Sequence, residues 1–315
     1  MMVLLIDGLN VFMRHYAANP SMTQHGDAAG GVVGFLGGLG SLCRKFNPSE
    51  VHIMWEGGGS LRRRAIYKDY KRGRKPQKFN RYYEDDIPDT TTNRLGQVAF
   101  LTRCLRHLPV YQHYIKDCEA DDVIGYCARY KFKNQDVVIV SSDKDFYQLI
   151  DERVKVWSPG QKRLITEDVV VEKMHVRPSN VALTRAFVGD PSDNIKGIKG
   201  VGFKTLSKRF SLLKSEERVS LDFIFTECER LKETSKIRVY NNITEHKDIV
   251  RRNLKLMCLD ISNLAATQIQ QIEGSLEINE KKYDKLAFLR SLRKFGLINF
   301  DPSLLFLPMN LLNKR

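Results

Sequence analysis

Three short apolar runs along the chain each end in acidic residues. They cover residues 3–7 (VLLID), 51–56 (VHIMWE) and 136–145 (DVVIVSSDKD). Runs of this length that are rich in β-branched residues and bounded by polar ones predict buried strands. Helical spacing is found in the stretches 30–46, 93–108 and 119–131. Strands that alternate with helices predict an α/β fold with a parallel sheet.

The acidic residues that end these runs form a candidate site. Asp7 and Glu56 close the first two runs, and Asp143 and Asp145 close the third. Ligands of parallel α/β sheets bind beyond the carboxyl ends of the strands, so we expect these side chains to converge. Taken singly, an acid after a strand is an ordinary turn residue. The prediction therefore depends on all of them meeting at one edge of one sheet.

A further acidic group, Glu119, Asp121 and Asp122, precedes the helical stretch VIGYCARY. One acid at a helix start is an ordinary cap, but three within four residues exceed that need. Like charges ~4 Å apart cost on the order of 4 kcal/mol per pair at an effective dielectric of about 20. A converged cluster would therefore hold protons or cations, and oxygen ligands suit Mg²⁺ or Mn²⁺. Two such ions ~4 Å apart are a common device for cutting phosphodiesters.

The composition indicates a polyanionic partner. The chain has 315 residues, 42% of them hydrophobic, which is typical of a globular protein with a large core. Its 51 Lys and Arg against 37 Asp and Glu give a net charge of +14. This excess leaves nucleic acid and an anionic membrane surface as candidate partners.

Cysteine spacing and hydropathy indicate the cell compartment in which the protein is found. The six cysteines are widely spaced and form no CxxC pair, which indicates reduced thiols rather than a zinc site. The apolar N-terminal run is short and broken by Asp7, so it is not typical of a signal peptide. No stretch approaches the ~20 apolar residues that cross a bilayer. These features predict a cytoplasmic protein with no membrane segment.

Much of the positive charge is concentrated in residues 60–81, directly after the second apolar run. This segment holds ten Lys or Arg and a single acid, Asp69. Aromatic residues such as Tyr67 are interleaved with the charges, a composition suited to single-stranded nucleic acid. A solvated face, or a nuclear localisation signal at KRGRK, are the other interpretations. The candidate contacts to a nucleic acid backbone in this segment are Arg62, Arg63, Arg64 and Lys68.

Residues 189–205 (GDPSDNIKGIKGVGFKT) match a phosphate-binding P-loop only in part. Gly197 and Gly202 have the P-loop spacing, but Phe203 separates Gly202 from Lys204. The residues before Gly197 are polar, whereas a P-loop follows a buried strand. The sequence therefore does not support a nucleotide site here.

Five stretches, in order, resemble the metal-dependent 5′-nucleases, a family that includes flap endonucleases, bacteriophage 5′-exonucleases and the 5′-nuclease domain of bacterial DNA polymerase I. They are LLIDGLN, YKDYKRGR, CEADDVIGY, SSDKDFYQL and GDPSDNIKGIKGVG, all within residues 1–210, with a fainter match at KLAFLRSLRKFGL. The resemblance implies a PIN-like nuclease core at residues 1–176, with an arch at about 60–95. It also implies that residues 177–315 form a helical DNA-binding module of the helix–hairpin–helix type, followed by C-terminal helices.

The resemblance also implies two Mg²⁺ ions, for which Mn²⁺ can substitute, bound or oriented by a set of acidic residues. These are Asp7, Glu119, Asp121, Asp122, Asp143, Asp145, Asp190 and Asp193, with Asp122 either a ligand or a support for one. The family usually has Asp where this chain has Glu56, whose extra methylene is expected to shift the metal position. Lys71 and Arg74 match residues that grip the scissile phosphate, and Tyr70 matches an aromatic residue of the same gateway.

The glycine-rich stretch after Asp193 would be a hairpin between two helices. Gly197, Gly200 and Gly202 have no Cβ, which lets backbone N–H groups approach a DNA phosphate, and Lys199 and Lys204 add charge. The family often holds K⁺ in this hairpin, so the resemblance implies a K⁺ site here. The alternative is a glycine-rich turn with no ligand.

We therefore predict a metal-dependent 5′-nuclease that cuts DNA, or RNA primers in RNA–DNA hybrids, at 5′ ends or flaps. The expected protein partner is a replication clamp or a single-strand binding protein, in the cytoplasm of a bacterial or phage-infected cell. One alternative is a PIN-type ribonuclease for single-stranded RNA, which the hairpin disfavours. The other is a non-catalytic, structure-specific DNA-binding protein, which only Glu56 favours.

Overall fold

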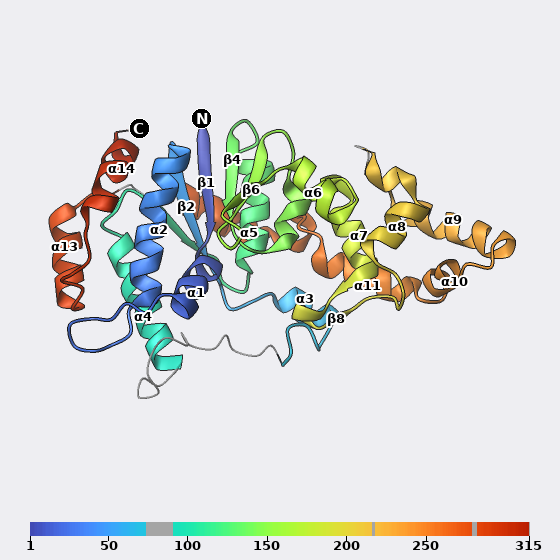
Figure 1. Ribbon diagram of the computed structural model, residues 1–315, viewed down its shortest axis with the longest axis horizontal. Coiled ribbons are helices and arrows are strands. Elements are labelled where there is room, and N and C mark those ends of the chain that lie inside the picture. Colours follow the sequence, from blue (N-terminus) through green and yellow to red (C-terminus); the bar gives the residue numbers. More distant parts are fainter. Residues whose placement is uncertain (74–90, 216–217, 279–281, 315) are drawn as a thin grey trace.

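A six-stranded sheet forms the centre of the protein in the computed structural model, which describes residues 1–73, 91–215, 218–278 and 282–314 (Figure 1). The strand order is β3-β2-β1-β4-β5-β6, and only β6 runs antiparallel to its neighbour. The strands are β1 (Met2–Asp7), β2 (Glu50–Trp55), β3 (Tyr111–Tyr114), β4 (Asp136–Val140), β5 (Val154–Ser158) and β6 (Arg163–Ile165). The predicted α/β fold with a parallel sheet is thus confirmed.

The register of the sheet brings the predicted strand ends together. Ile6 pairs with Ile53 of β2 and with Val140 of β4, so β1, β2 and β4 end at nearly the same level. Asp7 lies at this edge, Glu56 follows β2 by one residue, and the acids after β4 begin three residues beyond Val140. The third predicted strand was too long, because the chain turns after Val140 into a 3-10 helix at Lys144–Leu149.

Each strand alternates its side chains between two hydrophobic cores. On β1, Val3 and Leu5 enter one core and Leu4 and Ile6 enter the other, and all four are at most 1% exposed. Burying a side chain of this size stabilises the fold by roughly 1.5–3 kcal/mol. A strand that is apolar on both faces must be covered by helices on both sides.

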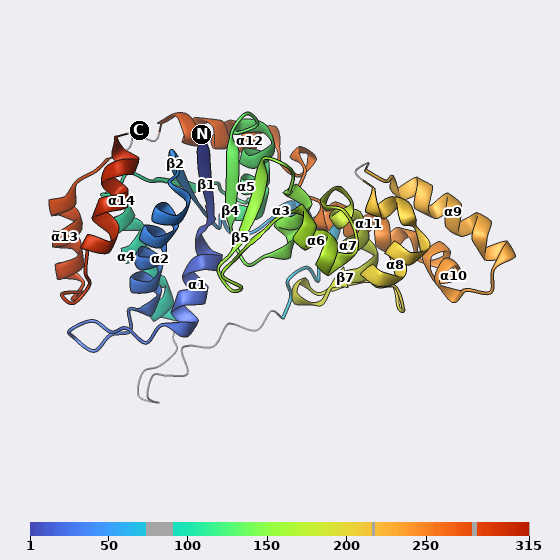
Figure 2. The same cartoon turned by 45° about the horizontal axis from the view of Figure 1, so that its top comes forward.

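Helices cover both faces of the sheet, as Figures 1 and 2 show. The first core is shared with α5 (Ala120–Tyr126), which continues as a π-helix at Cys127–Lys131, and with α6 (Glu167–Met174) and α12 (Ala266–Ile278). The second core is shared with α1 (Gly8–Ala18), α2 (Gly30–Phe46), α4 (Thr91–Leu105), α13 (Lys285–Lys294) and α14 (Ser303–Asn313). The short α3 (Leu61–Ile66) leads from the end of β2 into the basic segment.

A second group of helices extends away from the sheet (Figure 1). It comprises α7 (Val181–Val188), α8 (Phe203–Arg209), α9 (Leu221–Thr234), α10 (Arg238–Glu245) and α11 (Lys247–Met257). A small hairpin of β7 (Gly189–Asp190) and β8 (Ile195–Lys196) joins α7 to α8. A Cβ on Gly197 would lie 2.0 Å from the Val188 carbonyl oxygen, so this tight turn requires glycine.

The hydrophobic core does not break where the predicted domain boundary lies. Residues from Val3 of β1 to Phe225 of α9 belong to one continuous core. The division at residue 176 therefore stays a prediction. Within the described residues, no helix has the length and apolar character needed to cross a membrane.

Candidate active site

Carboxylates meet at the carboxyl edge of the sheet, where the sequence predicted them. Asp7 caps α1 by accepting a hydrogen bond from the Asn10 amide at 3.1 Å, and its other oxygen accepts one from Ser141 Oγ at 3.0 Å. Burial, and then repulsion by Asp121, raise the pKa of Asp7 to about 7. Asp7 therefore lies close to an acid that is more than a hundred residues away along the chain.

The acids after β2 and β4 share this environment. Burial, followed by repulsion from Asp121, raises the pKa of Glu56 to about 8. Asp143 caps the 3-10 helix after β4 by accepting from the Asp145 amide at 2.8 Å. The pKa of Asp143 is also raised, first by burial and then by Asp121. Since Asp121 acts on Asp7, Glu56 and Asp143 alike, it lies at the centre of the group.

We call Asp7, Glu56, Asp121 and Asp143 the uncompensated carboxylates, because none of them forms an ion pair with a Lys or Arg that the structure describes. Their convergence agrees with the sequence prediction, and their role as metal ligands remains a prediction. In the described ranges, no set of three or more His, Cys, Asp or Glu side chains is arranged to hold an ion as it stands.

A second set of acids is held by cations of the protein itself. Arg63, on α3, lies 2.6 and 2.7 Å from the two oxygens of Asp122 and 2.7 Å from Glu119 Oε2. Its Nε donates to the Leu256 carbonyl at 2.8 Å, and the residue is only 2% exposed. The predicted contact between Arg63 and DNA is therefore wrong, because the side chain is buried in an ion-pair network.

The same geometry favours one of the two predicted roles of Asp122, that of a supporting residue. Both of its oxygens accept hydrogen bonds from Arg63, and its side chain is 2% exposed. Burial raises the pKa of Asp122 to about 6, and the Arg63 guanidinium opposes that rise. Asp122 thus supports α3 and the start of α5 rather than offering a free oxygen to an ion.

Two residues of the basic segment, Tyr70 and Lys71, donate hydrogen bonds to the Glu119 carboxylate. Tyr70 Oη donates to Glu119 Oε2 at 2.9 Å, and Lys71 Nζ donates to Glu119 Oε1 at 2.9 Å. Lys71 has a left-handed backbone (φ 56°), and its amide donates to the Asp193 carbonyl at 3.0 Å. Burial lowers the pKa of the Lys71 ammonium, but Asp121 and Glu119 raise it more, so Lys71 stays charged. Tyr70 and Lys71 therefore lie at the acidic site, as the resemblance implied.

Arg185 is a residue of the site that the sequence prediction missed. It projects from α7, and its Nη2 lies 2.6 Å from both Asp145 Oδ1 and Asp190 Oδ2. Burial raises the pKa of Asp145 well above its ordinary value, and Arg185 opposes this. The sequence held one signal, since Arg185 is the only charged residue in the apolar stretch VALTRAFV.

We call Glu119, Asp122, Asp145 and Asp190 the cation-held carboxylates. Arg63, Lys71 and Arg185 hold them, and each of these cations is at most 24% exposed. Asp193 is also buried, at 8% exposure, in the turn beside Lys71. The acidic site therefore combines carboxylates that form ion pairs with others that form none within the described ranges.

The remaining predicted DNA contacts lie around the site in different settings. Lys68, Lys199 and Lys204 are exposed, and Gly200 and Gly202 flank the turn into α8, where Gly200 has a positive φ of 79°. Arg64 is exposed and donates to the Gly58 carbonyl at 2.6 Å, whereas Arg62 donates to Asn263 Oδ1 at 2.5 Å. Arg74 and the rest of residues 74–90 of the predicted arch lie outside the described residues.

Known proteins resemble this chain over most of its length. A family model described as the 5′-3′ exonuclease N-terminal resolvase-like domain matches residues 2–175. A 5′-3′ exonuclease of Aquifex aeolicus is 29% identical over 85% of this chain and 91% of its own length. Flap endonuclease Xni of Shewanella piezotolerans is 30% identical over 67% of this chain and 77% of its own.

A solved structure shows the same fold. The bacteriophage T5 flap endonuclease, in a pseudo-enzyme-product complex with DNA and metal ions, superposes with a TM-score of 0.65. The superposition covers 88% of this chain and 99% of the T5 chain at 19% identity. At this identity the similarity concerns the arrangement of helices and strands.

Proposed function

The chain belongs to the 5′-3′ exonuclease family, and from that premise we propose that it hydrolyses phosphodiesters at 5′ ends or 5′ flaps of DNA, with two divalent ions in the acidic site. It is a nuclease, as its relatives are. RNA primers in RNA–DNA hybrids are included in the proposed substrates. The single observation that carries the proposal is the group of uncompensated carboxylates at the carboxyl edge of the sheet.

These carboxylates fit a hard divalent ion. Asp7, Glu56 and Asp143 all have raised pKa values because they are buried and face Asp121. A dication removes that repulsion, and an all-oxygen donor set suits Mg²⁺ or Mn²⁺ rather than softer metals. We propose that Asp7, Glu56, Asp121, Asp143, Asp145, Asp190 and Asp193 hold or orient the two ions, with Glu119 in support. When bound, such ions activate water as a nucleophile and stabilise the charge that develops on phosphate.

Lys71 is placed to act on the substrate phosphate. Its Nζ lies 2.9 Å from Glu119 Oε1 and its side chain is 24% exposed, so a phosphate that arrives from solvent can compete for it. We propose that Lys71 donates to a non-bridging oxygen of the scissile phosphate, where charge grows in the transition state. The 2.9 Å hydrogen bond from Tyr70 keeps the Glu119 side chain in position. Arg74 is proposed for the same phosphate.

The turn between β8 and α8 is the proposed contact to duplex DNA. Backbone amides around Gly197, Gly200 and Gly202 supply donors for a phosphate, and exposed Lys199 and Lys204 supply charge. The Asn242 side chain anchors this turn, because its Nδ2 donates to the Lys199 carbonyl at 3.1 Å. A K⁺ ion bound by carbonyls of the turn is part of the proposal, and so are contacts from Arg62, Arg64 and Lys68.

Two further parts of the proposal concern the cell. A replication clamp or a single-strand binding protein is the proposed partner, because 5′ flaps arise next to both during replication. The proposed compartment is the cytoplasm of a bacterial or phage-infected cell, and the relatives named above are bacterial.

The test uses a DNA duplex with a 5′ flap, labelled at the 3′ end of the flap strand, incubated with the protein in Mg²⁺ and separately in EDTA. Mg²⁺-dependent cuts at the flap junction support flap endonuclease action, and a ladder from the 5′ end supports exonuclease action. Cleavage that persists in EDTA contradicts the metal proposal. Tight binding without cleavage in Mg²⁺ or Mn²⁺ contradicts the nuclease and favours a non-catalytic DNA-binding protein.

A further inference from the structure

Helix α14 is apolar on two opposite faces. Leu305, Met309 and Leu312 are at most 2% exposed and belong to the core shared with α2. On the other side, Leu304, Leu307 and Leu311 are 50%, 64% and 49% exposed. Their spacing of three and four residues places them in one stripe along the helix. An apolar stripe on a helix normally packs against another element, but in the described residues this one is about half exposed or more.

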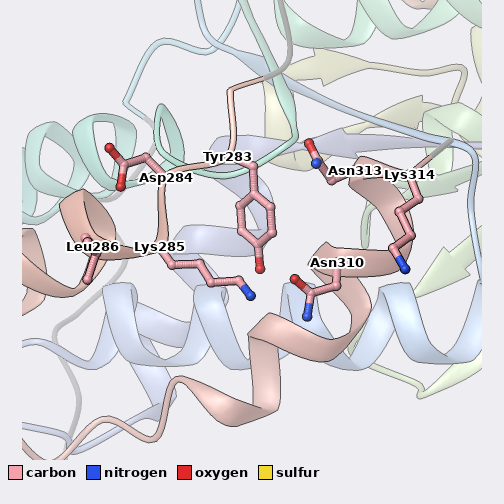
Figure 3. Close-up of a pocket in the computed structure, with 7 residues that line it drawn as sticks. All are labelled: Tyr283, Asp284, Lys285, Leu286, Asn310, Asn313 and Lys314. Carbon is pink, nitrogen blue, oxygen red and sulfur yellow. The ribbon is translucent and has the colours of Figure 1, made fainter.

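A polar groove lies beside this stripe, between the start of α13 and the end of α14 (Figure 3). It has a volume of about 600 Å³ and is lined by Tyr283, Asp284, Lys285, Leu286, Asn310, Asn313 and Lys314. Figure 3 shows Lys285, Tyr283 and Asn310 pointing toward one another across it. Leu286, at its edge, is 65% exposed and extends the apolar surface.

The groove holds hydrogen-bond donors in fixed positions. Lys285 Nζ lies 5.4 Å from the centre of the Tyr283 ring and 5.6 Å from that of Phe306, which holds the ammonium over two aromatic faces. Tyr283 Oη donates to the Phe306 carbonyl at 3.3 Å, which ties the groove wall to α14. The carboxylate that lines the groove, Asp284, accepts from the Ala287 amide as the cap of α13.

The surrounding charge is positive. Residues 282–314 contain six Lys or Arg and two acids. Both acids accept hydrogen bonds from backbone amides close in the sequence. Asp284 caps α13, and Asp301 accepts from the Ser303 amide at 2.9 Å. This part of the protein therefore presents exposed leucines beside an ammonium and amide donors, under a net positive potential.

We propose that the C-terminal face, defined as Leu286, Leu304, Leu307 and Leu311 with Lys285, Asn310 and Lys314, docks a partner protein through a short acidic segment with leucine-sized apolar side chains. Nucleic acid does not match this face. Proteins bind unpaired bases by stacking them on aromatic rings, whereas the exposed stripe here consists of leucines. A second copy of the chain would bring two positive surfaces together. A segment with both acidic and apolar side chains covers the leucines and pairs with the positive charge.

The position of the C-terminal face fits a tethering role. In Figure 1, α13 and α14 lie at one end of the molecule and α8, α9 and α10 at the other, with the sheet between them. A partner on the C-terminal face would leave the turn at Gly197–Gly202 accessible. The inference does not depend on the proposed nuclease chemistry, because it uses no residue of the acidic site.

The test is a display selection of a random dodecapeptide library against the full chain, followed by fluorescence anisotropy with the enriched peptides. We expect enriched peptides that combine Asp or Glu with Leu, Ile or Phe. Leu307→Ser with Leu311→Ser should weaken their binding at least about tenfold, and Lys285→Glu about fivefold, because contacts at a docking site centre dominate affinity. Leu212→Ser is the matched control, since Leu212 is 47% exposed elsewhere and should leave binding unchanged.

Several results would overturn the proposal. Enriched peptides that are basic or purely polar do so, and so does binding that the paired leucine changes leave intact. A selection that yields no peptide dependent on the C-terminal face also overturns it. If sedimentation shows a dimer that Leu307→Ser with Leu311→Ser dissolves, a second copy occupies the face instead. Unchanged thermal unfolding and flap cleavage in the variants show that folding is intact.

Discussion

The cation-held and the uncompensated carboxylates occupy one acidic site, yet the protein treats their charges in opposite ways. Arg63, Lys71 and Arg185 lie within 2.9 Å of the cation-held acids. Asp7 and Glu56, in contrast, have pKa values raised to about 7 and about 8 and form no ion pair within the described ranges. An ion pair with a cation of the protein stabilises a buried acid, whereas an acid without one stores repulsion that a ligand can relieve.

Replacing Asp121 by Asn should have the largest effect, because Asp121 raises the pKa of Asp7, Glu56 and Asp143 together. Cleavage of a 5′-flap duplex in Mg²⁺ should fall at least about a thousandfold, or about 4 kcal/mol of transition-state stabilisation. The same change should raise the thermal midpoint of the protein in EDTA, because it removes repulsion. Steady-state cleavage and thermal unfolding measure the two effects.

Asp168→Asn is the matched control for this experiment. Asp168 is exposed in the first turn of α6, so the change removes one charge at a helix start without touching the acidic site. It should leave both cleavage and the midpoint in EDTA nearly unchanged. An Asp121→Asn protein that loses activity and is also less stable in EDTA would contradict the idea that this acid stores repulsion.

Replacing Arg63 by Met tests the other side of the comparison. It leaves Asp122 and Glu119 buried without their guanidinium, which should lower the free energy of unfolding by about 3–5 kcal/mol. Arg64→Met, on the same helix, changes an exposed residue that donates to the Gly58 carbonyl and should cost less than about 0.5 kcal/mol. Urea unfolding of both variants measures the difference. If the two agree within about 1 kcal/mol, Arg63 does not hold the acidic site together.

These two arginines show why the sequence predicts one group of carboxylates better than the other. Asp7, Glu56 and Asp143 follow apolar strands, and the parallel-sheet rule places such residues at one edge before any contact is known. The partner of Arg63 lies 59 residues away, and inside the basic segment Arg63 looks like any other cation. A local pattern cannot show which one of several cations is buried.

The helices and strands were also predicted best where the local pattern of apolar residues is strong. Strands that are apolar on both faces were predicted, as was α2, whose bounds agree with the predicted 30–46. The edge strand β3 has the polar sequence YQHY and was missed, because only half of its surface faces the core. β5 and β6 were also missed, although the alternation in VKVWS is itself typical of a strand, and RLI is very short.

Replacing Arg185 by Met should give an intermediate effect that separates positioning from folding. Without Arg185, Asp145 and Asp190 lose the counter-charge that competes with an ion, so the Mg²⁺ concentration needed for half-maximal cleavage should fall about tenfold, equivalent to about 1.4 kcal/mol. Arg185→Lys should restore part of the original Mg²⁺ requirement. Arg177→Met, which breaks a more exposed ion pair of 2.6 Å with Glu167, should leave the Mg²⁺ requirement unchanged. An Arg185→Met protein with normal Mg²⁺ dependence would limit Arg185 to a structural role.

The smallest expected effect is a pH dependence of stability that Mg²⁺ reverses. A carboxyl group whose pKa is raised on folding keeps its proton in the folded state and loses it in the unfolded state, so the metal-free protein should lose stability as pH rises from about 4 to about 8. Asp7, at about 7, and Glu56, at about 8, set the upper end of this window. The loss should be spread over the whole of this window, and Glu56→Gln should reduce it above pH 7. Because Mg²⁺ binds the ionised form, stability in saturating Mg²⁺ should instead rise with pH, and thermal midpoints from pH 5 to 9, with Mg²⁺ or EDTA, would show it. Parallel curves in Mg²⁺ and EDTA would mean that the uncompensated carboxylates do not bind the ion.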